Sequence, residues 1–172
     1  MHRLMVLYLV DGYLSYDRPC HVMAETIIVR ECRHGQVRVQ FGNIIRVDGD
    51  IMVIPANNRL AGREGLDERM QLAAGDELRA RCTEIAVERR KEGKQPCGVG
   101  EAVSTSGYNL PAENLVHVVA PDCRRPNQDN FRRELLVNSY NAMFDEISKI
   151  EPRKTVVTPP LGMDVFAYPH RE

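Results

Sequence analysis

The sequence predicts a single α/β domain, a three-layer α/β/α sandwich around a mixed, largely parallel sheet. Short runs that are apolar throughout, such as residues 4–10 and 51–54, are typical of strands buried on both faces. Segments with helical periodicity alternate with these runs, as a parallel sheet covered on two faces requires. A chain of 172 residues with 43% hydrophobic side chains is long enough for one such domain and its core.

Strand predictions follow residues 4–10 along the chain. Residues 26–30 and 36–40 flank a turn-like segment and predict a hairpin. Residues 51–54 (IMVI) form the next strand, which we expect Pro55 to end because proline cannot donate to a strand ladder. Three later strands are predicted over residues 101–105, 115–120 and 154–158.

Three helices are predicted between these strands. Residues 66–74 and 76–91 form two of them, separated by a glycine. The third runs to about residue 150 and can be capped by Asn127 or Asp129. The apolar stripe expected to bury it comprises Phe131, Leu135, Leu136, Tyr140, Met143, Phe144 and Ile147.

Charge, cysteine content and hydropathy exclude several functional classes. The 23 Lys and Arg residues face 24 Asp and Glu residues, so no net basic field exists to hold nucleic acid. The five cysteines are odd in number and lack metal-ligand spacing, which favours reduced thiols, no bound metal and a cytoplasmic location. The apolar run before Asp11 is far shorter than the roughly 20 residues of a membrane span, so we expect no membrane association.

Two loops are candidates for a binding site. Ligands of largely parallel sheets bind beyond the carboxyl ends of the strands, where residues 55–65 and 159–169 begin. Gly62 and Gly65 precede a helix, whose unpaired N–H groups and dipole can hold a diphosphate. The same glycines fit a turn beside a helix cap, so this pattern alone leaves both alternatives open.

Three motifs in order resemble the macro domain family, over residues 36–172. DIMVIPANNRLAGREGLDERMQLAAG, residues 50–75, resembles the family's buried strand, asparagine-bearing turn, glycine-rich loop and following helix. CGVGEAVSTSGYNLPAENLVHVVAP, residues 97–121, and VFAYPHRE, residues 165–172, are similar to two later family motifs. The resemblance implies the macro-domain α/β/α sandwich, ADP-ribose or an ADP-ribosylated protein as partner, and no cofactor. Nucleic acid is not expected unless it is itself ADP-ribosylated.

The resemblance also implies site residues. Asn57 matches the loop asparagine that contacts the distal ribose, and Asp67 matches the aspartate that positions or activates water, so these two are the catalytic candidates. A carboxylate at a helix start is also simply favourable with the dipole, and Asn58 fits an Asx turn at least as well as a ligand contact. Phe166 stands either at the family's aromatic wall or in the core. The other ligand-binding candidates are Asn43, Ile44, Ala56, Asn58, Gly65, Leu66, Gly162, Met163, Asp164 and Val165. Residues 106–108 are expected to shape the floor of the cleft.

The chain departs from the family pattern at several of these positions. Asn43 replaces an acidic residue that binds the adenine amine, so that hydrogen bond loses its charge assistance. Gln71 replaces the histidine of one hydrolase branch and cannot titrate, and no lysine nucleophile lies between Asn57 and Asp67. Four residues stand where family glycines are usual: Arg63, Glu64, Asp164 and Ala167. Because Asp164 would place negative charge near an anionic ligand, we expect weaker binding than in a typical member.

The chain ends where family members normally continue through a helix and a final strand. Residues 4–16 resemble that strand, so the N-terminal extension, residues 1–35 of the single domain 1–172, is predicted to supply it as a circular permutation would. Three functions stay open. The chain hydrolyses mono-ADP-ribose linkages or ADP-ribose esters, it reads ADP-ribose without chemistry, or it is a degenerate scaffold whose cleft binds nothing.

Overall fold

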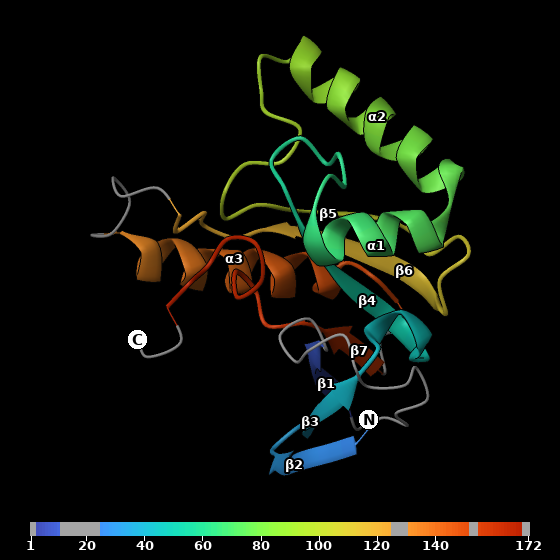
Figure 1. The fold of residues 1–172 in the computed structure, drawn as a ribbon, viewed down its shortest axis with the longest axis vertical. Coiled ribbons are helices and arrows are strands. Elements are labelled where there is room, and N and C mark those ends of the chain that lie inside the picture. Colours follow the sequence, from blue (N-terminus) through green and yellow to red (C-terminus); the bar gives the residue numbers. More distant parts are fainter. Residues whose placement is uncertain (1–2, 11–24, 125–130, 152–154, 170–172) are drawn as a thin grey trace.

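A computed structural model describes residues 3–10, 25–124, 131–151 and 155–169. Figure 1 shows a central sheet with helices on either side of it. The sheet has seven strands, in the order β2 (Glu25–Cys32), β3 (Gly35–Gly42), β1 (Arg3–Val10), β7 (Thr155–Thr158), β4 (Gly49–Ala56), β6 (Ala112–Val119) and β5 (Ala102–Ser106). The four inner pairings are parallel, and the outer pairings β2–β3 and β5–β6 are antiparallel. The predicted mixed, largely parallel sheet and the predicted hairpin are confirmed.

The helices form the two outer layers. Helices α1 (Gly65–Ala74) and α2 (Asp76–Lys91) pack on one face of the sheet, and α3 (Arg132–Ser148) packs on the other. A short 3-10 helix, η1 (Ile44–Arg46), follows β3.

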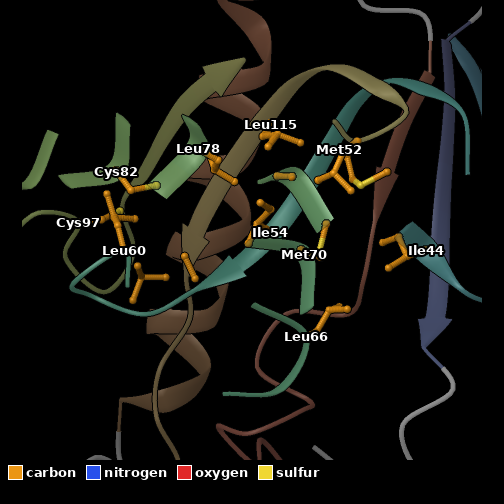
Figure 2. Close-up of a cluster of buried hydrophobic side chains, with 14 of the residues drawn as sticks. Ile44, Met52, Ile54, Leu60, Leu66, Met70, Leu78, Cys82, Cys97 and Leu115 are labelled. Atoms are coloured by element: carbon orange, nitrogen blue, oxygen red, sulfur yellow. The ribbon is translucent and has the colours of Figure 1, made fainter. Parts of the chain in front are cut away.

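Strand β4 explains why one run of the sequence is apolar throughout. Met52 and Ile54 point into the core beneath α1 and α2, which Figure 2 shows, whereas Ile51 and Val53 point toward α3. All four side chains are 0% exposed. A strand between two helical layers has no solvent face, so its apolar residues cannot alternate with polar ones.

Two of the predictions on these elements are wrong. Strand β4 does not end at Pro55 but pairs with β6 as far as Ala56. Its pairing with β7 ends at Met52, so at Pro55 the strand has a neighbouring strand on one side only, as at a sheet edge where proline is tolerated. In α3, Phe131 and Phe144 are 64% and 47% exposed, and the buried face is centred on Met143 and Ile147 instead. The capping candidates Asn127 and Asp129 lie outside the described residues.

Strand β1 lies between β3 and β7, parallel to both. It therefore belongs to the same sheet as the strands that lead into the two candidate loops. Residues 11–16 lie outside the described residues, and the replacement of the family's last strand by the N-terminal extension stays a prediction. Because β4, β6 and β7 run parallel, their carboxyl ends meet at one edge of the sheet. A ligand-binding site is expected at this edge.

A matched pair of leucine substitutions tests this packing. Leu115 on β6 is 0% exposed and Leu72 on α1 is 57% exposed. Leu115→Ala should lower the free energy of unfolding by about 2–5 kcal/mol because it leaves a cavity in the core, and Leu72→Ala should change it by less than about 1 kcal/mol. Urea unfolding followed by circular dichroism measures both values. Similar losses in the two variants would contradict the assigned layers.

Candidate functional site

A pocket opens at the edge of the sheet where β4, β6 and β7 end. The space between its walls is about 440 Å³, a figure that includes the open solvent at its mouth. Its lining residues come from the two candidate loops, the first turn of α1 and the residue after β6: Pro55, Ala56, Asn57, Glu64, Asp67, Ala120, Pro160, Gly162, Asp164, Val165 and Phe166. Segments about 100 residues apart in the sequence therefore face each other across one pocket.

The structure brings most of the residues predicted from the sequence to this pocket. Seven of them line it: Ala56, Asn57, Asp67, Gly162, Asp164, Val165 and Phe166. Gly65 and Leu66 lie directly behind them at the start of α1, and Met163 is half-buried in the second loop. Four lining residues were not predicted from the sequence: Pro55, Glu64, Ala120 and Pro160. Ala120 follows the third parallel strand that ends at this edge, so the rule that located the two loops could also have located it.

Three predicted residues are placed elsewhere. Asn43 is exposed and caps η1, its Oδ1 accepting a hydrogen bond from the N–H of Ile45 at 3.2 Å. Ile44 is completely buried in the core. Asn58 is exposed, and its carbonyl accepts a hydrogen bond from the N–H of Cys97. None of the three is among the described residues that line the pocket.

Residues 106–108 do not form the floor of this pocket, contrary to the expectation from the sequence. They lie at the turn between β5 and β6, at the amino end of β6. Their neighbour Asn109 donates its N–H to the carbonyl of Ala74 at the far end of α1. The antiparallel β5–β6 connection carries this motif to the opposite edge of the sheet.

Asn57 and Asp67, which both line the pocket, are joined by hydrogen bonds. The backbone N–H and the Nδ2 of Asn57 both donate to Oδ2 of Asp67, at 3.3 and 3.1 Å. The Oδ1 of Asn57 accepts from the N–H groups of Arg59 and Ala61. Asn57 itself, and not Asn58, therefore makes the Asx turn that shapes the first loop.

Gln71 holds the other oxygen of the same carboxylate. It lies one helical turn after Asp67, and its Nε2 donates to Oδ1 of Asp67 at 3.2 Å and to the carbonyl of Leu60 at 3.3 Å. Its side chain is 1% exposed. An amide at this position cannot titrate, but it orients the carboxylate and fixes the first loop against α1.

Burial sets the protonation behaviour of Asp67. The residue is only 5% exposed, and this desolvation raises the pKa of its carboxyl from 3.8 to about 6, although hydrogen bonds from Asn57, Gln71 and the backbone of Gly62 act in the opposite direction. At neutral pH the group is ionised yet more basic than an ordinary aspartate. A carboxylate of this kind at a pocket wall can accept a proton from a bound water.

Asp164 spans the pocket from the second loop to the first. Its Oδ2 accepts a hydrogen bond of 2.8 Å from the N–H of Leu66 in the first turn of α1. Glu64, the residue at the N-cap position, makes no side-chain capping bond. A residue 98 positions away in the sequence thus satisfies one of the N–H groups that a helix start leaves without an intrahelical partner.

Phe166 lines the pocket, and the Arg124 side chain lies over its ring. The Arg124 guanidinium lies 5.7 Å from the centre of the Phe166 ring, and it pairs with Asp122 at 2.8 Å and with Glu64 at 3.5 Å. Phe166 also packs against the core beneath α3. Phe166 is therefore both a lining residue of the pocket and a partly buried neighbour of the core, and its role as an aromatic wall for a ligand stays a prediction.

Among the described residues, no three His, Cys, Asp or Glu side chains gather closely enough to hold a metal ion. No helix within the residues that the structure describes is long and apolar enough to cross a membrane.

A three-layer α/β/α domain with a pocket between two loops at the carboxyl edge of its sheet belongs to a broad class of small-molecule-binding domains. The sequence profile of the macro domain family matches residues 53–172, and the chain belongs to this family. A macro domain-containing protein of Mesorhizobium japonicum is 32% identical over 137 residues, which cover 80% of this chain and 71% of that protein. An O-acetyl-ADP-ribose deacetylase of Escherichia fergusonii is 30% identical over 136 residues, covering 78% and 71%.

The fold is also similar to that of solved macro domains. The structure of the Oceanobacillus iheyensis macrodomain with ADP superposes with a TM-score of 0.75 and 25% sequence identity, over 86% of this chain and 74% of that one. The fold predicted from the sequence, the macro-domain sandwich, is confirmed.

The raised pKa of Asp67 predicts how its isosteric substitution affects stability. Because the folded-state pKa lies above the unfolded one, Asp67 loses its stabilising contribution as the pH rises from about 4 through 6. Asp67→Asn does not titrate, so its free energy of unfolding relative to wild type should rise over this interval by about 3 kcal/mol. Urea unfolding from pH 4 to 7.5 measures the difference, with Asp145→Asn on the exposed side of α3 as the control for loss of one carboxylate. A difference that does not change with pH would show that Asp67 is not desolvated.

Proposed function

We propose that this chain binds ADP-ribose or an ADP-ribosyl group in the pocket and hydrolyses a bond on the distal ribose. The substrate class is a protein side chain that carries mono-ADP-ribose, or a small ADP-ribose ester. One observation carries the proposal: a buried, more basic carboxylate, that of Asp67, lines the pocket at the carboxyl edge of the sheet and is oriented by Asn57 and Gln71. The names of the deacetylase relative and of the macrodomain structure with ADP support the same ligand class.

Each group has a chemical role in this reaction. The Nδ2 of Asn57 donates one N–H to Asp67 and can offer its second N–H to a ribose hydroxyl. Asp67 accepts a proton from a water as the water oxygen attacks the anomeric carbon or, in an ester, the carbonyl carbon. The bond to the leaving group then breaks, and the leaving oxygen or nitrogen takes up a proton. Phe166 supplies an apolar wall for the ribose.

A reader that binds ADP-ribose without chemistry is the second candidate function. It is favoured by the engagement of both oxygens of the Asp67 carboxylate, since Asn57 donates to one and Gln71 to the other. A water must share these oxygens with the two amides. A reader would saturate with ADP-ribose and release nothing from a modified protein, so binding and release have to be measured side by side.

The location of the protein is a further part of the proposal. We propose a cytoplasmic location because the described cysteines, Cys32, Cys82, Cys97 and Cys123, are free thiols. We also propose that residues 1–35 replace the family's last strand within a single domain. The position of β1 between β3 and β7 supports this proposal.

Substitution of Asp67 separates the hydrolase from the reader. Asp67→Ala should bind ADP-ribose with an affinity within about tenfold of wild type, whereas release of ADP-ribose from a mono-ADP-ribosylated protein should fall by about two orders of magnitude or more, because the general base is lost. Calorimetry measures the binding, and a gel-based release assay measures the turnover. Asp145→Asn is the matched surface control. Turnover that survives in Asp67→Ala would refute the role assigned to this carboxylate.

A further inference from the structure

The carboxylate of Asp164 lies where the pocket would hold an anionic group of a ligand. A helix start exposes N–H groups without intrahelical partners and the positive end of the helix dipole, which together attract phosphate. At the start of α1, the N–H of Leu66 is such a group, and it donates to Oδ2 of Asp164 at 2.8 Å. Asp164 is also a lining residue of the pocket. The protein thus places its own carboxylate at the start of this helix.

The local backbone makes this approach possible. Gly65 has a φ of +64°, and a Cβ atom there would lie 2.5 Å from Oδ2 of Asp164. Any residue with a side chain at position 65 would push the carboxylate away as well as strain the backbone. The glycine that opens the helix therefore also makes room for Asp164.

The second loop holds Asp164 in this position. The carbonyl of Asp164 accepts a hydrogen bond from the N–H of Ala167, and the carbonyl of Gly162 accepts one from the N–H of Tyr168. Tyr168 is only 7% exposed and anchors the end of the loop. The backbone that carries the Asp164 carboxylate is therefore held in a turn by hydrogen bonds within the loop.

We propose that Asp164 is a specificity-determining residue that competes with the phosphate groups of a ligand for the start of α1. A phosphate can take the Leu66 N–H only after the carboxylate has left it, and the two anions repel each other within one pocket. The apparent affinity for phosphate-bearing ligands is reduced by the fraction of the protein in which Asp164 occupies the position. The identity of the ligand rests on the proposed function, but the competition for an anion does not.

Neutral substitutions of Asp164 test this competition. Asp164→Asn keeps the size and an acceptor oxygen but removes the charge, and Asp164→Ser keeps a short capping acceptor should the first variant fold poorly. Asp145→Asn is the control for net charge. Calorimetry with inorganic pyrophosphate and with ADP-ribose should show both Asp164 variants binding at least about tenfold tighter than wild type, with the control unchanged. Without ligand, both variants should melt at a lower temperature than wild type, because the helix start loses its charged cap.

The two ligands distinguish this inference from the proposed function. Tighter pyrophosphate binding in the Asp164 variants, with no ADP-ribose binding in any form of the protein, would support the competition and refute the proposed ligand. ADP-ribose binding of equal strength in wild type and variants would support the ligand and overturn the competition. Absence of any gain for either ligand in both variants would also overturn it.

Discussion

The site depends on the hydrogen bonds that the Asp67 carboxylate accepts inside the protein. A buried carboxylate is costly unless donors surround it, and here Asn57 supplies two and Gln71 a third. These bonds tie the loop after β4 to the first turns of α1. They fix Asn57 and Asp67 relative to each other before any ligand arrives, and the incomplete compensation for burial is what makes the carboxylate more basic.

Residues that depart from the family pattern make specific hydrogen bonds and ion pairs in this structure. Gln71 cannot replace the titrating histidine of one hydrolase branch, but its amide orients Asp67. The carboxylate of Asp164 cannot donate a hydrogen bond to a phosphate, but it caps α1. Glu64 pairs with Arg124, which covers Phe166. The pocket is therefore preserved with a changed set of charges, and a degenerate scaffold is the function that this geometry favours least.

Local patterns in the sequence were sufficient to predict much of the fold and the place of the site. The apolar run at 51–54 is a central strand, and the rule on carboxyl ends brings the two loops together. The predictions that were wrong depend on contacts between segments that are distant in the sequence. Whether Pro55 can stay in a strand depends on how far β7 extends, and the exposure of Phe131 depends on where α3 meets the sheet. The bond between Asp164 and Leu66 joins residues 98 positions apart, which no spacing rule reveals.

If the loops after β4 and β7 form one binding surface for ADP-ribose, the ligand must perturb both of them. A titration of the ¹⁵N-labelled protein with ADP-ribose, followed through its backbone amide signals, tests this. We expect shifts to concentrate in residues 56–67 and 160–166, with the Leu66 signal among the largest, while the signals of β2 remain in place. Shifts confined to one loop, shifts centred on the turn between β5 and β6, or no shifts at millimolar ligand would contradict it.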